Sequence, residues 1–340
     1  MAIYNNDDIK KIIVSRTDNL GDVILTLPLI TQIKKTFPQA KITFLIKHYV
    51  YDLIKDYPGI YDFAFIDELN TSFALKTYFK QKNFDAIFNV YPRFEIALAS
   101  FLTGIKYRIG TGYRWYSYLF NKKIYEHRKT ADKHEAVYNL NLLNSLSESK
   151  NDFTPEFCFN VSEDEINKLE QKLKQFDFEV NSDFIIVHIP SKGSASRLPT
   201  GKFIEFIDIF HTEFKFHKII LTGVQEERQE IEYVVESLKE KLKDKSNVIN
   251  LCGKLSLSEL KVLISKCKLF VSNSTGPIHI AGALNKNIIG FYPHLLPANK
   301  NRWKPLSSNA VILEPETDDD MNSIKNERIM LEARKLLKEK

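Results

Sequence analysis

Short apolar runs and amphipathic stretches alternate along almost the whole chain. The runs are rich in Val, Ile, Leu and Phe, which predicts buried strands, and between them apolar residues recur every three or four positions, which predicts helices. Such alternation is typical of an α/β fold in which helices cover a parallel sheet. We expect strands at 10–15, 41–46, 63–66, 86–90, 184–189, 218–222, 248–251, 269–271 and 287–291, and helices at about 23–37, 72–81, 94–102, 132–147, 162–175, from 202, 277–284 and 323–339.

The alternation is broken once near the middle of the chain. Residues 148–161 carry charge and a proline but no periodicity, which is typical of a linker. A chain of 340 residues has room for two α/β domains. The sequence therefore predicts a first domain at 1–155, a second at 156–322, and a charged C-terminal helix within 323–340 that packs back across the domain junction.

Small polar residues separate the strand at 269–271 from the helix that follows it. Ser274, Thr275 and Gly276 lie where the helix begins, and Pro277 takes a first-turn position that tolerates proline. The N–H groups and the positive dipole end of a helix start attract anions, and a glycine lets a ligand approach the backbone. This turn is a candidate phosphate site. An ordinary capped helix after a strand is the alternative.

The first strand is followed by a polar turn that runs from Arg16 to Asp22. It lies at the carboxyl end of a strand, where open α/β sheets bind ligands. A dinucleotide-binding turn needs G-x-G-x-x-G, but only Gly21 is present, which argues against a dehydrogenase. Asp22 is either a carboxylate that pairs with a helix dipole or a general base. Asp18 is the rival base, or an N-cap or turn residue.

Composition narrows the class of protein. The chain is 44% hydrophobic and 27% charged, which suits a soluble globular protein with a sizeable core. Its three cysteines are scattered, with neither a disulfide framework nor a zinc spacing, so we expect a reducing cytoplasm. The N-terminus lacks a signal-peptide pattern and no apolar run approaches the length of a membrane span. A net charge of +5 favours an acidic partner.

Residues 106–133 combine positive charge with aromatic side chains. Eight Lys or Arg stand against two acidic residues, and seven Phe, Tyr or Trp lie between them. Such a segment fits nucleic acid, a membrane surface or an acidic glycolipid, and it also fits a solvated loop with a few core aromatics. No nucleic-acid-binding module surrounds it, so nucleic acid ranks last and is not expected as a partner. Arg114 and Lys122 are the candidates for binding an acidic acceptor.

Two of these stretches resemble one known family. Residues 274–284, STGPIHIAGAL, resemble the donor-site signature of glycosyltransferase family 9, the ADP-heptose:lipopolysaccharide heptosyltransferases, except that Ser274 replaces the family's leading Asp. Residues 16–46 resemble the family's N-terminal signature, in which the catalytic base falls on Asp22. The resemblance implies a GT-B architecture: two Rossmann-like domains with parallel sheets that face a central cleft, with the acceptor in the first and the donor in the second.

The resemblance also implies donor-binding residues in the second domain. Arg197 matches a family loop whose lysine contacts donor phosphate, but Ser196 replaces that lysine, and Lys192 or Lys202 is the nearby substitute. Glu227 aligns with a glutamate that meets the nucleotide ribose, and Glu226 is the second choice. The expected donor-binding residues are Lys192, Ser196, Arg197, Glu226, Glu227, Ser274, Thr275, Gly276, Pro277 and His279.

The function that this resemblance implies is inverting glycosyl transfer from a nucleotide-diphospho-sugar. Heptose from ADP-heptose is the expected sugar, and a lipopolysaccharide core or related bacterial surface glycan is the expected acceptor. One carboxylate suffices to deprotonate an acceptor hydroxyl, so neither a metal nor another cofactor is expected. The acceptor would be an anionic glycolipid, bound by Asp18, Gly21, Arg114 and Lys122, with the protein at the cytoplasmic face of the inner membrane and in peripheral contact with it.

Two other interpretations stay open. A non-catalytic protein that binds sugar-nucleotides or glycans with the same fold is favoured by Ser196 and Ser274 in place of the family's Lys and Asp, and disfavoured by the retention of Asp22. A nucleotide-dependent epimerase of the related GT-B type would react without any acceptor. Only turnover separates these interpretations.

Overall fold

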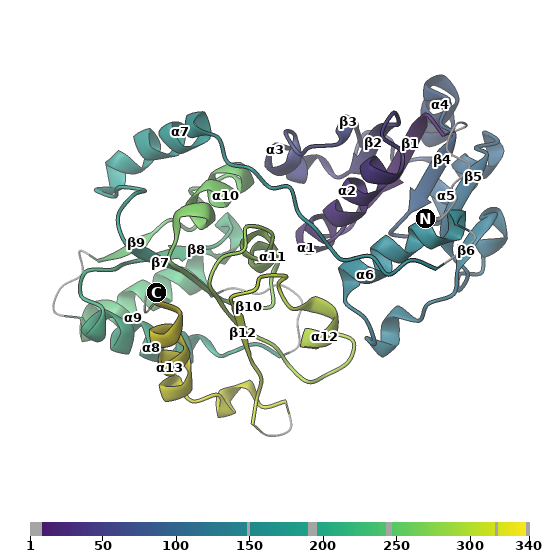
Figure 1. Cartoon of the computed structure of the whole chain (residues 1–340). Helices are drawn as coiled ribbons and strands as arrows, with labels where there is room; N and C mark the ends of the chain where they lie inside the picture. Colours follow the sequence, from purple (N-terminus) through teal and green to yellow (C-terminus); the bar gives the residue numbers. More distant parts are fainter. Residues whose placement is uncertain (1–8, 148–149, 190–195, 243–246, 317–318, 338–340) are drawn as a thin grey trace. The chain divides into compact units, whose positions relative to one another are not determined.

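A computed structural model describes residues 9–147, 150–189, 196–242, 247–316 and 319–337 (Figure 1). The chain divides into two compact units, Met1–Cys158 and Phe159–Lys340. Within the described residues each unit contains one six-stranded sheet, and every strand pair is parallel. The predicted α/β fold with two parallel sheets is confirmed.

The first sheet has the strand order β3-β2-β1-β4-β5-β6. The order reverses beside β1, which pairs with β2 on one side and with β4 on the other. Ligands of open α/β sheets bind outside the carboxyl ends of the strands at such a reversal. The strands are β1 (Lys11–Ser15), β2 (Lys41–Ile46), β3 (Ile60–Phe65), β4 (Ala86–Asn89), β5 (Tyr107–Thr111) and β6 (Lys122–Ile124).

Helices of the first unit bury their apolar faces against this sheet. One apolar cluster joins Ile13 of β1 and Ile87 of β4 to Leu75, Phe79 and Ile96 from the helices, all nearly inaccessible to solvent. The helices of this unit are α1 (Leu20–Ile24), α2 (Leu27–Thr36), α3 (Tyr51–Ile54), α4 (Ser72–Lys82), α5 (Phe94–Leu102) and α6 (Glu135–Leu140).

The prediction of one helix at 23–37 is wrong, because the chain forms two helices here. Thr26 is the N-cap of α2 and Pro28 lies in its first turn, where the missing N–H removes no hydrogen bond. Thr26 Oγ1 donates to the Asp22 carbonyl at 2.8 Å and closes the end of α1. Asp22 therefore lies inside a short helix of its own, which starts at Leu20.

The second sheet has the order β12-β11-β10-β7-β8-β9, so its first strand in the chain, β7, again lies at the reversal and pairs with β10. Its strands are β7 (Phe184–His188), β8 (Lys218–Thr222), β9 (Val248–Asn250), β10 (Leu269–Asn273), β11 (Ile288–Phe291) and β12 (Ala310–Leu313). The helices are α7 (Glu163–Leu173), α8 (Thr200–Glu213), α9 (Arg228–Lys241), α10 (Leu257–Lys266), α11 (Gly276–Ala283), α12 (Lys300–Trp303) and α13 (Asn326–Leu337).

The helix α13 packs within the second unit. It lies beside α8, as Figure 1 shows, and Arg334 binds Glu213 with two hydrogen bonds of 2.6 and 2.7 Å. Ile329, Met330 and Ala333 are buried in the main apolar cluster of this unit. Among the described helices, none is long and apolar enough to cross a bilayer.

The basic segment and the helix after it also differ from expectation. β5 and β6 fall within 106–133, where the sequence suggests no strand. Of the helix predicted at 132–147, only α6 (Glu135–Leu140) is an α-helix. The next residues, Asn141–Leu146, form a 3-10 helix. Asn144 binds the backbone of Asn151 from both of its amide atoms, at 2.9 and 3.1 Å. Such local side-chain bonds compete with a continuing α-helix.

Candidate functional site

At the carboxyl end of β1 a buried arginine gathers acidic side chains. Arg16 is 3% exposed; its Nε donates to Asp18 Oδ1 at 2.8 Å and its Nη1 to Glu135 Oε1 at 3.1 Å. Its Nη2 donates to Asp22 Oδ1. Asp22 itself is buried, with a side chain 12% exposed, in the first turn of α1. A buried guanidinium needs such partners, so Arg16 fixes the positions of three carboxylates.

The charges of this cluster alter one another's protonation. Burial opposes the charge of Arg16, but Asp22, Asp18 and Glu135 raise its pKa, so the guanidinium stays protonated. Burial raises the pKa of Asp18 to about 6; Arg16 opposes this rise and Asp22 adds to it. Tyr49 faces the same group, and burial together with Asp18 and Asp22 raises the pKa of its phenol. Asp18 thus changes its charge close to neutral pH.

A second layer of polar side chains surrounds Arg16. Glu135, fully buried on α6, also accepts a hydrogen bond from Arg128 Nη1. Asn139 accepts from Arg128 at 3.0 Å and donates to the Leu25 carbonyl at 2.9 Å, so α6 is tied to the end of α1. Sequence reasoning missed the roles of Glu135, Asn139 and Arg16. Glu135 and Asn139 are spaced four residues apart and so lie on one face of the predicted helix. A carboxylate and an amide on one helix face are the signal that would have indicated a polar contact made by α6.

Buried polar atoms also collect where β1 and β4 end. Among the described residues, Ser15 Oγ, Thr17 Oγ1 and Asn89 Oδ1 are buried without a hydrogen-bond partner. Ser15 and Asn89 are neighbours in the strand register. Groups of this kind are normally satisfied by water or a ligand. This edge of the first sheet is therefore chemically suited to a hydroxyl-rich guest.

The structure corrects one prediction about this first site, and two other predicted residues lie outside the Arg16 cluster. The N-cap of α1 is Asn19, whereas Asp18 precedes it at a bend and pairs with Arg16, so the N-cap interpretation of Asp18 is wrong. Gly21 is the second residue of α1 and is buried. Arg114 is exposed in the loop after β5 and Lys122 is half-buried on β6. Within the described part of the chain, Arg128 is the residue of the basic segment that reaches the Arg16 cluster.

In the second unit a buried asparagine organises the matching edge of the sheet. Asn273 ends β10 and is 1% exposed; its Nδ2 donates to the Ile189 carbonyl at 3.0 Å. Its Oδ1 accepts from the Leu198 N–H at 2.8 Å, so the segments on both sides of residues 190–195 are held to β10. The sequence reasoning missed this role. A polar amide directly after an apolar strand at the sheet's reversal is the signal.

The start of α11 lies directly after Asn273. Thr275 is the N-cap and Pro277 lies in the first turn, as predicted. Among the residues that the structure describes, the Thr275 side chain makes no capping hydrogen bond to the helix, and its hydroxyl instead lies 3.1 Å from Ser272 Oγ. The Ser274 side chain hydrogen-bonds the fully buried Tyr292 phenol, whose pKa burial raises. His279 is buried on α11 and faces the Trp303 ring with centroids 6.4 Å apart.

The other predicted donor residues differ in their positions and in the groups that they contact. Lys192 lies outside the described residues, and Ser196 is half-buried at their edge. Arg197 forms an ion pair with Glu230 at 3.1 Å. Glu227 accepts the Val224 N–H at 2.8 Å and so caps the turn before α9, while Glu226 is exposed in that turn. Among the described residues no group of three or more His, Cys, Asp or Glu is placed to hold a metal ion.

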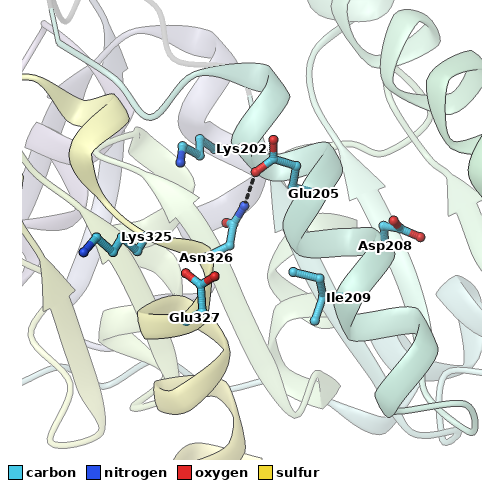
Figure 2. Close-up of a pocket in the computed structure, with 7 residues that line it drawn as sticks. All are labelled: Lys202, Glu205, Asp208, Ile209, Lys325, Asn326 and Glu327. Atoms are coloured by element: carbon cyan, nitrogen blue, oxygen red, sulfur yellow. Dashed lines mark hydrogen bonds between the residues drawn. The ribbon is translucent and has the colours of Figure 1, made fainter.

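A separate cavity of about 320 Å³ lies between α8 and α13 (Figure 2). Figure 2 shows Asn326 pointing toward Glu205, and its Nδ2 donates to that carboxylate at 2.6 Å. Lysines and carboxylates share the lining with Ile209: the lining residues are Lys202, Glu205, Asp208, Ile209, Lys325, Asn326 and Glu327. Lys202, a predicted substitute for the family lysine, lies on α8 and lines this cavity.

Comparison with known proteins now decides the family. The family model described as glycosyltransferase family 9 (heptosyltransferase) matches residues 72–332, well over half of the chain. The chain belongs to glycosyltransferase family 9. The protein is thus a glycosyltransferase by family, and the expectation drawn from residues 16–46 and 274–284 is confirmed. The matched region includes α11 but begins after Asp22.

Three similar proteins show how far this family 9 chain resembles other sequences and structures. A Haemophilus influenzae protein, named provisionally as a glycosyltransferase, is 27% identical over 88% of this chain and 86% of its own length. The lipopolysaccharide core heptosyltransferase OpsX of the same organism is 24% identical over 94% of this chain and 89% of its own. The solved Escherichia coli ADP-heptose lipopolysaccharide heptosyltransferase II superposes with a TM-score of 0.79 at 20% identity, covering 97% of this chain and 98% of its own.

Proposed function

We propose that this family 9 glycosyltransferase moves heptose from ADP-heptose onto an anionic lipopolysaccharide core, with inversion at the transferred carbon and with Asp22 as the base. The observation that carries the proposal is the position of Asp22. Its carboxylate is buried at the carboxyl end of β1, beside the reversal of the sheet, and bound by Arg16. The names of the heptosyltransferases that the chain resembles supply the sugar and the acceptor class.

The base acts by removing a proton from the acceptor hydroxyl as it attacks the sugar. The oxygen forms a bond to the anomeric carbon, the bond to the nucleoside diphosphate breaks on the opposite face, and the proton passes to Asp22. Ser15, Thr17 and Asn89 supply buried polar groups at the same strand ends, which suits a hydroxylated acceptor. Asp18 is the competing base, because it binds the same arginine and burial raises its pKa to about 6.

The donor would bind in the second unit at the start of α11. Backbone N–H groups of Thr275 and Gly276 would donate to the diphosphate, and the helix dipole would favour its charge. Pro277 and His279 shape this helix start, and Ser274 borders it. Lys192, Ser196 and Arg197 precede α8 along the chain. Arg197 or Lys192 would help to neutralise the leaving group, Ser196 could add only a neutral hydroxyl, and Glu226 or Glu227 would meet the ribose. This chemistry requires no metal.

The acceptor side would include the basic segment of the first unit. Arg114 and Lys122 are accessible to an anionic glycolipid, and Gly21 and Asp18 line the approach to the base in this proposal. Trp115 and Tyr118 on the same segment are 72% and 66% exposed, and amphipathic rings beside positive charge suit a membrane interface. We therefore place the protein at the cytoplasmic face of the inner membrane, in peripheral contact with lipid.

A turnover screen tests the proposal. The purified protein is incubated with ADP-heptose, or with UDP- and GDP-hexoses, and with lipopolysaccharide cores truncated at successive sugars, and the glycan mass is measured. We expect a heptose-sized increase with ADP-heptose on one core. If sugar is transferred only from another nucleotide-sugar, ADP-heptose is not the donor. If no donor supports transfer, the proposal is contradicted.

Binding without catalysis is the second candidate function. Ser274 is half-buried and binds Tyr292, so a neutral hydroxyl takes the position of the family's Asp, and Arg197 already has Glu230 as its partner. Both observations mean that less positive charge is available in the second unit to stabilise a departing diphosphate. Tight ADP binding by calorimetry, combined with no product from the screen, supports this candidate. Conversion of the donor without any acceptor indicates an epimerase.

A further inference from the structure

A chain of alternating charges leads from the surface to Asp22. Arg128, whose side chain is 26% exposed, binds Glu135; Glu135 binds Arg16 at 3.1 Å; and Arg16 binds Asp22. Asn139 accepts from both arginines, at 3.0 Å from Arg128 and 3.4 Å from Arg16. One carboxylate oxygen, Glu135 Oε1, thus receives both guanidinium groups.

We propose that Glu135 and Arg128 are positioning residues that set how firmly Arg16 holds Asp22. The inference rests on the proposed role of Asp22 as base. Arg16 divides its hydrogen bonds among three carboxylates, so weakening one of these bonds strengthens the others. Arg128 also donates to Glu135, which weakens the bond between Glu135 and Arg16 and so strengthens the bond between Arg16 and Asp22.

Few other charged groups face this chain among the described residues. Asp18 contacts Arg16 at 2.8 Å and interacts with Asp22, and burial together with the charges of both aspartates raises the pKa of the Tyr49 phenol. The ring of Tyr138, on α6, lies 5.7 Å from the Arg128 guanidinium. His134, which precedes Glu135, accepts the Ala136 N–H through Nδ1 at 3.2 Å.

The two ends of the chain therefore predict opposite effects. Glu135→Gln removes a negative charge that competes for Arg16, so Arg16 stabilises the Asp22 carboxylate more and the base becomes weaker. Arg128→Gln leaves Glu135 to Arg16 alone, so Arg16 stabilises Asp22 less and the base becomes stronger but loses its charge at a higher pH. Damage to packing alone would lower activity in both variants without moving the two profiles in opposite directions.

The experiment measures kcat against pH, from about 4.5 to 8, with the acceptor and donor that the parent turns over. The acid limb of Glu135→Gln should move down by roughly 0.5–1 pH unit, because Glu135 contacts Arg16 directly. That of Arg128→Gln should move up by a similar amount or less, because Arg128 acts on Arg16 through Glu135. Lys129→Gln, which removes an exposed positive charge next to Arg128, is the matched control and should leave the limb in place. A thermal melt checks that each variant folds.

Acid limbs that stay in place, or that move in the same direction in both variants, overturn the inference. If Glu135→Gln does not fold, the direction of the Arg128→Gln shift decides alone, since Arg128 is partly exposed. Failure of the proposed function is recognised separately: Asp22→Asn would then retain both the parent's rate and its acid limb. If Asp22→Asn loses activity but the two variants show no opposite shifts, Asp22 remains the proposed base and only the positioning role of Glu135 and Arg128 is contradicted.

Discussion

The two sheets have the same strand order but end in different chemistry. In the first unit the reversal beside β1 holds a buried arginine among three carboxylates. In the second unit the corresponding reversal beside β7 holds the neutral amide of Asn273, and hydroxyls and backbone groups follow it at the start of α11. One topology thus gathers charged carboxylates around an arginine in one copy and presents mainly neutral amide, hydroxyl and backbone groups in the other.

The difference fits the two tasks that we propose for these sites. A proton can be accepted only by a group whose charge changes, and its protonation depends on its charged neighbours. A diphosphate that arrives with its charge is held as well by backbone N–H groups, which need no counter-charge of their own. We therefore expect the first site to respond to pH and to charge, and the second to respond to steric access.

Removal of Arg16 should have the largest effect on stability. Arg16→Met leaves Asp18, Asp22 and Glu135 without their shared partner, and breaking a buried ion pair in this way costs about 3–5 kcal/mol. Urea denaturation measures the free energy of unfolding. Arg334→Met, which breaks the more exposed pair with Glu213, is the control and should change stability far less. Equal losses would mean that the Arg16 cluster has no special role in the fold.

Asp18 should impose a pH dependence on stability. Its pKa is about 6 in the folded protein against 3.8 in the unfolded chain, so the folded state binds more protons between these values. Stability should therefore fall as pH rises from about 4 to 6, by about 2–3 kcal/mol at most, and Asp18→Asn should flatten this slope. Denaturation midpoints across this range provide the measurement.

Asp56→Asn, which removes an exposed carboxylate of the same unit, serves as the control for this slope. It should leave the pH dependence of the parent unchanged. A parent whose stability rises through the range from pH 4 to 6, with no change in Asp18→Asn, would show that Arg16 and not burial dominates the protonation of Asp18.

In the second unit the expected effect is on ligand binding. Gly276 is the first residue of α11, and it is not among the described glycines with positive φ, so a side chain there acts by blocking the backbone and not by strain. Gly276→Val should weaken ADP binding by roughly 1–3 kcal/mol, the cost of charge-assisted hydrogen bonds left unmade, without changing adenosine binding. Calorimetric titration of both ligands measures this.

Gly201→Val provides a matched control, because Gly201 also lies in the first turn of a helix in this unit and a Cβ there meets no atom within 4 Å. ADP should bind this variant as it binds the parent. Unchanged ADP affinity in Gly276→Val would mean that the start of α11 is only a cap and that the diphosphate binds elsewhere.

The smallest effect is expected at the exposed basic segment. Reversing the charges of Arg114 and Lys122 should raise the acceptor KM about 2–5-fold at low salt and leave the donor KM unchanged, since exposed charge pairs contribute little and salt screens them. Reversing Lys76 and Lys80, both exposed on α4, makes the same change in net charge and should leave both constants in place. Equal losses for acceptor and donor would indicate damaged folding.

Sequence periodicity predicted most of the fold because the strands are continuous apolar runs. The strand at 41–46, the helix at 94–102 and the strand at 218–222 match their observed bounds. β5 and β6 were missed because Arg108, Lys122 and Lys123 interrupt the apolar pattern. Arg108 donates to the Leu119 and Ile105 carbonyls at 2.8 and 2.6 Å, contacts that depend on tertiary structure and leave no local signal.

The candidate site was predicted only where residues close in sequence form it. Asp22 and the Ser274–Gly276 turn each lie in one local motif, directly after a strand. Glu135 is 119 residues from Arg16, and Leu198 is 75 residues from Asn273, so neither contact follows from spacing. Long-range polar pairs of this kind become visible only when the sheet order is known.

The most direct test of the account compares Asp22→Asn with Asp18→Asn in the transfer assay. An asparagine at either position keeps an oxygen for Arg16, so each variant should fold and bind ADP like the parent. We predict that kcat falls by a factor on the order of 10²–10⁴ in Asp22→Asn, the usual contribution of a general base, and by far less in Asp18→Asn. Parent-like turnover in Asp22→Asn, with the loss found in Asp18→Asn instead, would contradict the assignment of the base.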